Sequence, residues 1–163
     1  MNAMDILRYG HQIVEQALDG LPDAAWTVPG ACGEWSVQDI LAHLASFELL
    51  LVDVLHSVLR EGPTLTLTSF IAGPEQFNTR EVSQRRGLLA HEVWEEYEGA
   101  YRKTLTLLAQ VPIRVRRLNG TLPWYGVAYD LEDFIVYTAY GHKREHCAQI
   151  AAFREQWSQR AQR

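Results

Sequence analysis

The sequence predicts an all-α protein built as a bundle of four helices. Four stretches repeat apolar residues at helical spacing, glycine or proline ends several of them, and no two alternating stretches pair as a β-hairpin. The chain has 163 residues, of which 47% are hydrophobic. We therefore expect one domain, residues 1–163, whose long amphipathic helices bury a shared core.

The first two predicted helices cover residues 5–18 and about 37–61. Glycine and proline follow the first helix closely and end it. The second begins after Ser36, and Asp39 three residues later forms a pattern close to a capping box. Its apolar stripe is wide and consists of Ile40, Leu41, Leu44, Phe47, Leu51, Val54, Leu55 and Val58.

A long connection follows the second helix. The TLTLTSF run within residues 63–73 alternates but has no strand partner, so we expect an extended crossover there. A short helix is predicted for residues 74–86, because Pro74 suits a helix start and Gly87 interrupts the pattern.

The third long helix is predicted at residues 88–111, where Pro112 ends it. Residues 114–129 should form a loop. The fourth helix begins at Asp130, a good N-cap, and continues to about residue 159. Its predicted inner face consists of Phe134, Ile135, Thr138, His142, His146, Gln149, Ile150, Phe153 and Trp157.

Charge and composition argue against nucleic-acid and membrane partners. The formal charge is −5, and basic residues do not cluster as they do in nucleic-acid-binding proteins. The longest apolar stretch, residues 49–54, is far too short to span a bilayer, and the N-terminus lacks a signal-peptide pattern. We therefore expect a cytoplasmic protein, in which Cys32 and Cys147 remain unlinked thiols.

Three histidines form a candidate metal site. His142 and His146 are four residues apart, so they share one helix face and can reach a common ion at about 2.1 Å. Both lie in the apolar stripe, where an unpaired imidazole is costly to bury. His43 lies in the stripe of the second helix, and bundles build ligand sites from such facing positions. Core histidines with ordinary hydrogen bonds remain the alternative.

Two motifs resemble those of a known family. The stretch GEWSVQDILAHLASFE is similar to the second-helix signature of the DinB/YfiT-like superfamily, and YGHKREHCAQI is similar to its fourth-helix signature. The resemblance implies an up-up-down-down four-helix bundle with one divalent metal ion on His43, His142 and His146. It favours zinc or nickel, with iron or manganese as alternatives. The FNTREV segment more weakly resembles colibactin self-resistance proteins.

The resemblance and the open site together suggest several functions. Three nitrogen ligands leave a coordination position open, as in catalytic sites. The family implies a metal-dependent hydrolase, or a transferase that joins a low-molecular-weight thiol to a small electrophilic substrate. A stress or self-resistance protein that sequesters a reactive compound or metal is an alternative, and so is a structural interaction bundle. No separate catalytic residue is predicted.

Relatives also suggest a homodimer. Leu49, Leu50 and Val52 lie off the apolar stripe of the second helix. They could mark a partner surface or contact the long crossover, and the sequence leaves both readings open.

Other residues near the site have weaker claims to a role. Asp39 could support His43 or simply favour the helix start, and Glu145 should face solvent. Cys147 should be an inert buried thiol. Trp124 and Tyr125 could wall a substrate pocket or pack over the core. The remaining histidines have no partner at ligand spacing and should be structural or exposed: His11, His56 and His91.

Overall fold

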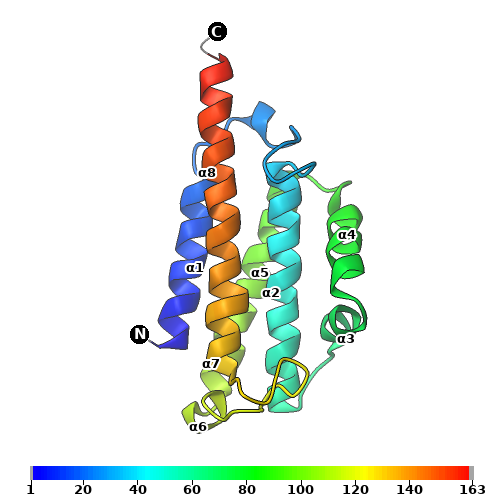
Figure 1. Ribbon diagram of the computed structural model, residues 1–163, viewed down its shortest axis with the longest axis vertical. Coiled ribbons are helices and arrows are strands. Elements are labelled where there is room, and N and C mark those ends of the chain that lie inside the picture. The colour runs from blue at the N-terminus through cyan, green and yellow to red at the C-terminus, as the bar shows by residue number, and fades with distance from the viewer. Residues whose placement is uncertain (1, 162–163) are drawn as a thin grey trace.

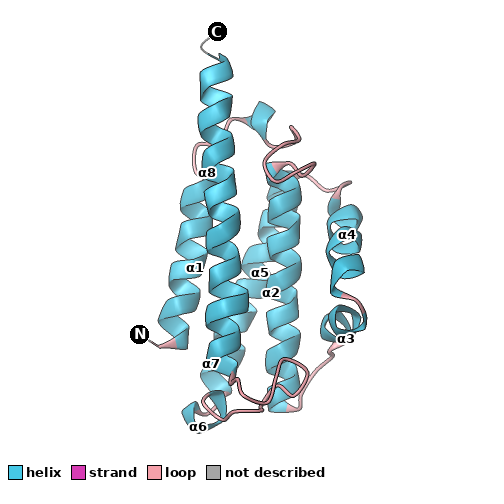
Figure 2. Ribbon diagram, in the orientation of Figure 1, coloured by secondary structure: helices cyan, strands magenta, loops and turns pink. Residues whose placement is uncertain are grey.

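The structure, a computed structural model, describes residues 2–161. The ends of the predicted domain, residue 1 and residues 162–163, lie outside the described residues. Figure 2 shows helices and loops only, and the described part contains one isolated β-bridge, between Cys32 and Trp35, but no strand. The predicted all-α class is confirmed.

Four long helical segments make up most of the molecule. They are α1 (Ala3–Leu18), α2 (Val37–Leu59), α5 (Ala90–Gln110) and a continuous segment formed by α7 (Leu131–Phe134), the π-helical η2 (Ile135–Gly141) and α8 (His142–Ala161). The shorter elements are η1 (Asp23–Ala25), α3 (Leu65–Ala72), α4 (Pro74–Arg85) and α6 (Ile113–Arg116). The long segments lie close to the predicted ranges, but the π-helical part was not expected.

The long helices do not follow the expected up-up-down-down order. Figure 1 shows α1 and α8 running toward one end of the molecule and α2 and α5 running toward the other. The loop of residues 19–36 turns the chain back, so α2 is antiparallel to α1. Helices α3 and α4 then return along α2, and Gln38 Nε2 donates to Leu88 O at 2.7 Å where α2 and α5 begin. The long crossover therefore makes α2 and α5, not α1 and α2, the parallel neighbours.

The expected extended crossover at residues 63–73 is wrong, because most of it is helix α3. The carboxylate of Asp53 accepts hydrogen bonds from Thr66 N at 2.7 Å and Leu67 N at 3.2 Å. These are amides that a helix start leaves without partners, and an anion there is favourable. The partner is a residue of α2, which local alternation in the sequence does not reveal. The next predicted helix, residues 74–86, is confirmed as α4.

The predicted loop at residues 114–129 is interrupted at its start by the one-turn helix α6. Arg116 fixes this turn by donating from Nε to Val111 O at 2.8 Å and from Nη2 to Leu108 O at 2.7 Å. These carbonyls lie at the end of α5, where the regular helical hydrogen bonds stop, and the Leu108 carbonyl also accepts from Val111 N at 3.1 Å. The arginine therefore joins the end of α5 to the loop that leads to α7.

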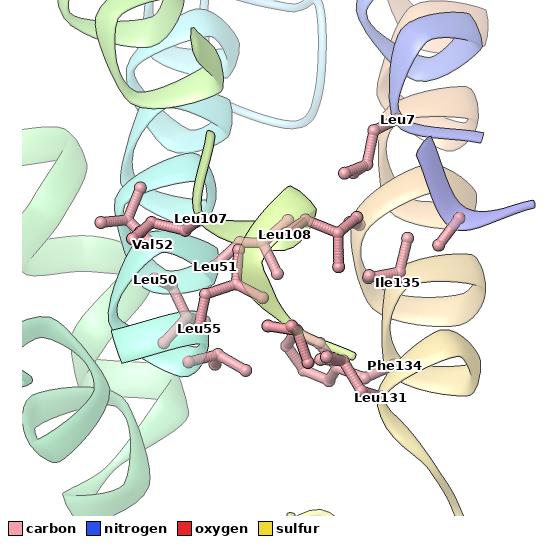
Figure 3. Packing of buried hydrophobic residues seen from close by; sticks show 14 of the residues in the cluster. Leu7, Leu50, Leu51, Val52, Leu55, Leu107, Leu108, Leu131, Phe134 and Ile135 are labelled. Carbon is pink, nitrogen blue, oxygen red and sulfur yellow. The ribbon is translucent and has the colours of Figure 1, made fainter. Parts of the chain in front are cut away.

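The core lies between α2, α5 and the last helical segment. Figure 3 shows Leu51, Leu108 and Ile135 reaching toward one another from these three elements, and each is at most 1% exposed. Of the three residues that could have marked a partner surface, Leu50 and Val52 are buried within the chain and Leu49 is half-buried against the same core. The homodimer stays a prediction.

Helix α2 is the most completely enclosed element. By length and composition it could cross a membrane, but 78% of its apolar window is buried inside the protein. Its start is fixed by the predicted capping box: Asp39 N donates to Ser36 Oγ at 3.1 Å and Ser36 N donates to Asp39 Oδ2 at 3.0 Å. The apolar character of α2 therefore serves the core of the bundle.

Shortening one core side chain tests this packing. Leu108 is fully buried, and Leu108→Ala should lower the free energy of unfolding by about 2–5 kcal/mol because it removes apolar contacts and leaves a cavity. Denaturant unfolding monitored by circular dichroism measures the loss. Leu65→Ala is the control, since Leu65 is 79% exposed and its loss should change stability by no more than about 0.5 kcal/mol. Equal effects of the two changes would contradict the described core.

Candidate metal centre

The structure brings the three predicted histidines together. His43 comes from the second turn of α2, and His142 and His146 come from the first two turns of α8. The Nε2 atoms of His43 and His142 are 2.8 Å apart, and those of His146 and His142 are 3.0 Å apart. All three rings therefore direct the same nitrogen toward one point between α2 and α8.

These separations suit one shared cation. Imidazole nitrogens bind zinc at about 2.0–2.1 Å, so two such nitrogens around one ion lie about 2.9 Å apart at a right angle and about 3.4 Å apart at the tetrahedral angle that zinc prefers. The three histidines also form a group of potential ligand atoms that all lie within 4.8 Å of one another. Side chains with neutral imidazole nitrogens suit zinc, nickel, copper or iron, so the donor set leaves the metal open.

Burial keeps the imidazoles neutral, as metal ligands must be. Desolvation, followed by the charges of the neighbouring histidines, lowers the pKa of His43 from 6.5 to about 3. Desolvation also lowers the pKa of His142 to about 3, with His146 and Lys143 as further causes. The pKa of His146 is lowered by desolvation as well, although its bond to Gln149 opposes the shift.

The ring nitrogens cannot all form hydrogen bonds with one another, and this favours a cation between the rings. His146 Nδ1 lies 2.8 Å from Gln149 Oε1, which fixes a proton on Nδ1 and leaves the Nε2 lone pair facing His142. His142 Nε2 touches both neighbours but can take part in only one N–H···N bond. One close contact therefore has no hydrogen bond, and an ion bound by the lone pairs would remove that repulsion.

A π-helical turn directly precedes the histidine pair. Segment η2 ends at Gly141, and regular α-helix resumes at His142. A π-turn holds more residues than an α-turn and is often found at functional sites. It sets the rotation of α8 relative to α7, and so the direction in which His142 and His146 project.

Aromatic side chains surround the histidines. The ring of Trp35 lies 5.0 Å from that of His43, and the ring of Phe47 lies 4.3 Å from that of His142. Phe47 in turn contacts Phe70 of α3 and Phe77 of α4, at 5.8 and 6.0 Å between ring centres. The crossover helices therefore complete an apolar surround that lowers the local dielectric constant and limits access of water.

The weaker candidates have ordinary structural roles. Asp39 belongs to the capping box and to an ion pair with Arg86 at 3.5 Å, so it does not support His43. Glu145 is exposed, as expected. Cys147 is half-buried with its pKa raised to about 11, mainly by desolvation, which suits an inert thiol. Trp124 packs against Phe134 with ring centres 5.5 Å apart, beside the core.

One of the three remaining histidines does have potential partners. His11 Nε2 lies 3.6 Å from Glu15 Oε1, and Glu98 lies within reach of both. The expectation that His11 has no partner considered only other histidines and missed the carboxylates. This group suits a metal less well, because Glu15 is exposed and Glu98 pairs with Arg102 at 2.7 Å.

Sequence reasoning also missed two charged residues beside the site. Glu48 on α2 and Lys143 on α8 form an ion pair whose side chains are only 1% and 4% exposed. Each occupies an inward position of an otherwise apolar stripe. Opposite charges at inward positions of two predicted helices were the signal that could have revealed the pair.

A hollow of about 1010 Å³ lies away from the histidines. It is lined by the end of α1, the start of α5 and the loop between α1 and α2, including Trp26 and Trp94. None of the three clustered histidines lines it.

Comparison with known proteins identifies the family. A family model described as "Mycothiol maleylpyruvate isomerase N-terminal domain" matches residues 7–134, well over half of the chain. The chain belongs to this family. The mycothiol maleylpyruvate isomerase N-terminal domain is a DinB/YfiT-like domain of the metal-binding type, so the resemblance seen in the sequence is confirmed. Searches of curated proteins and of solved structures gave no match.

The match to the mycothiol maleylpyruvate isomerase N-terminal domain covers only part of the candidate site. It includes His43 but ends at residue 134, before His142 and His146. The geometry of the three rings is therefore evidence separate from the family match.

The lowered pKa values predict a pH-dependent stability of the metal-free protein. The unfolded chain binds protons on His43 and His142 near pH 6.5, whereas the folded chain does so only near pH 3. Their contribution is therefore fully present above about pH 6.5 and is lost as the pH falls toward 3. Denaturant unfolding with a chelator at about pH 7.5 and about pH 5.5 should show this loss, above the range in which carboxylates titrate.

His142→Asn should make the loss of stability between the two pH values smaller, because the variant lacks one of the imidazoles whose pKa is lowered. His91→Asn, a change at an exposed position, should leave it unaltered. Equal unfolding free energies of the wild-type protein at the two pH values would contradict the neutral cluster.

Loss of the Gln149 bond should weaken metal binding. Gln149→Ala removes the acceptor of the His146 Nδ1 proton, and loss of such a support typically lowers metal affinity about 10–100-fold. Competition with a chromophoric chelator measures the affinity for zinc. Gln156→Ala, at an exposed position of the same helix, is the control, and an equal affinity of the two variants would argue against this support.

Proposed function

We propose that this protein is a metal-dependent enzyme that joins a low-molecular-weight thiol to a small electrophilic molecule. His43, His142 and His146 would hold one divalent ion, with zinc or nickel favoured. The observation that carries the proposal is the convergence of three neutral Nε2 atoms, with separations of 2.8 and 3.0 Å from the nitrogen of His142. A bound ion would act as a Lewis acid that lowers the pKa of a thiol or a water molecule held beside it.

The surrounding residues suit a substrate with an apolar part. Half-buried Trp35 and Phe47 offer aromatic faces next to the histidines, and half-buried Phe70 packs against Phe47. Such faces bind apolar groups and exclude water from the reacting atoms. In the proposed reaction the thiol loses its proton to solvent, and its sulfur then forms a bond to an electrophilic carbon. In a substitution the leaving group departs with the electron pair. In an addition to a C=C bond conjugated to a carbonyl, as in maleylpyruvate, the electron pair moves onto the carbonyl oxygen and a proton from solvent completes the addition.

Two observations favour thiol transfer over hydrolysis. Hydrolysis usually needs a general base within hydrogen-bond reach of the attacking water. The nearby carboxylates have other partners: Glu48 pairs with Lys143, and Asp39 belongs to the helix cap. The family is also named after a mycothiol-linked enzyme, and mycothiol is a low-molecular-weight thiol. Hydrolysis remains the second version of the proposal, because a bound ion would activate water by the same effect.

The number of electrophile molecules consumed per chain distinguishes sequestration of the electrophile from enzymatic turnover. Consumption of one electrophile per chain would indicate a protective protein, and consumption of many would indicate an enzyme. A protein without metal would be the interaction bundle that the sequence left open. We further propose that the protein acts in the cytoplasm, where low-molecular-weight thiols keep cysteines such as Cys32 and Cys147 reduced.

Metal binding is tested with protein purified without a metal-affinity tag. Elemental analysis should give one zinc or nickel ion per chain, and the added ion should raise the melting temperature by mass action. His142→Asn should lower the affinity by more than the about 10–100-fold typical of a lost supporting bond, because it removes a ligand. His91→Asn is the control. Absence of metal, together with no thermal shift on adding zinc or nickel, would refute the metal centre.

The reaction is tested with the metal-loaded protein and a panel of electrophiles that includes maleylpyruvate. Consumption of the electrophile should require both the metal and an added thiol. Turnover without thiol would select hydrolysis, and no turnover with any metal would refute both enzymatic versions.

A further inference from the structure

The buried ion pair between Glu48 and Lys143 joins the two helices that carry the histidines. Lys143 follows His142 directly on α8, and Glu48 lies five residues after His43 on α2. Lys143 Nζ donates to Glu48 Oε1, and the two side chains are 4% and 1% exposed. The ion pair therefore lies close to the imidazoles along both helices, but its side chains project from a neighbouring face of each helix.

All four long helices meet at this pair. From α5, Thr104 Oγ1 donates to Glu48 Oε2 at 3.4 Å, and the rings of Tyr97 and Tyr101 lie 5.2 and 5.8 Å from Lys143 Nζ. From α1, Gly10 makes room for the lysine, since a β-carbon there would lie 3.3 Å from Lys143 Cδ. Residues of all four long helices therefore enclose the two charges.

Stability alone does not explain such a pair. Removing two charges from water is costly, and apolar residues of similar volume often give an equally stable or more stable protein. A buried pair does, however, restrict how two helices can be arranged, because the charges must meet. The known use of buried polar groups to fix helix register is the closest precedent.

The position of the pair connects it to the metal centre. Neighbouring residues on an α-helix project about 100° apart, so the direction of Lys143 determines that of His142. The π-helical η2 lies immediately before them and sets the rotation of α8 relative to α7. The ion pair is a contact after η2 that holds α8 against α2 in that rotation.

We propose that the Glu48–Lys143 pair is a positioning device for the metal centre, fixing α8 on α2 so that His142 and His146 meet His43. This inference rests on the proposed metal site. The pair touches neither substrate nor ion, and it acts through the geometry of the ligands.

The test replaces both charges by apolar side chains of similar size in the full chain. Glu48→Met/Lys143→Met should leave the melting temperature of the metal-free protein at or above that of the wild type. Its zinc affinity should fall about 10–100-fold, the effect typical of lost ligand support. With cobalt as a spectroscopic probe, the visible absorption bands of the variant should differ from those of the wild type, because the ligand geometry has changed.

A second, partly buried ion pair supplies the control. Arg85 of α4 pairs with Glu96 of α5 at 2.7 Å, and their side chains are 8% and 32% exposed. Arg85→Met/Glu96→Met should leave the zinc affinity and the cobalt spectrum of the protein unchanged. An equal loss of affinity in this control would show that any lost buried pair weakens the site, and would overturn the proposal.

The remaining outcomes also decide the matter. If Glu48→Met/Lys143→Met does not fold, Glu48→Asp keeps the charge but draws it back by one methylene, and it should show a smaller fall in affinity with an altered cobalt spectrum. Wild-type affinity and spectrum in either folded variant would overturn the positioning role. Absence of zinc or cobalt binding in the wild-type protein would instead refute the metal centre itself.

Discussion

Helix α2 has almost no face open to solvent, and this constraint organises the molecule. It packs against α5 and α8 on one side and against the crossover helices α3 and α4 on the other. A polar side chain on such a helix must find a partner inside the protein. Asp53 caps α3, Ser46 bonds to its own helix at 2.7 Å, Glu48 meets Lys143, and His43 meets His142. His142 Nε2 also contacts His146 Nε2 and can form only one of these two N–H···N bonds, and a cation would fit between the three rings.

Much of the fold follows from local sequence signals. The capping residues Ser36 and Asp130 and the terminating Pro112 placed the long helices within a few residues. Helix α3 could not be predicted in this way, because its first amides depend on Asp53, a residue of another helix. The order of helix directions also depended on distant contacts, since it is the path of α3 and α4 along α2 that makes α5 parallel to α2.

The candidate site was predictable to a similar extent. The spacing of His142 and His146 and the place of His43 in an apolar stripe made the three residues candidates, and the resemblance to the DinB/YfiT-like superfamily was needed to name them as one ligand set. Their protonation was not readable, because the lowered pKa values arise from burial and from the mutual proximity of the rings. The support from Gln149 and the aromatic contact of Phe47 likewise required the packing of α8 and α3 around α2.

The π-helical η2 sets the rotation of α8 relative to α7. A π-turn holds about one residue more than an α-turn, so the same residues wound as regular α-helix would rotate everything after them by about 100°. That rotation would carry His142 and His146 away from His43 without altering any ligand. The family match ends at residue 134, and η2 begins at the next residue, Ile135. In related chains, the number of residues between the position of Phe134 and the histidine pair is therefore as informative as the histidines themselves.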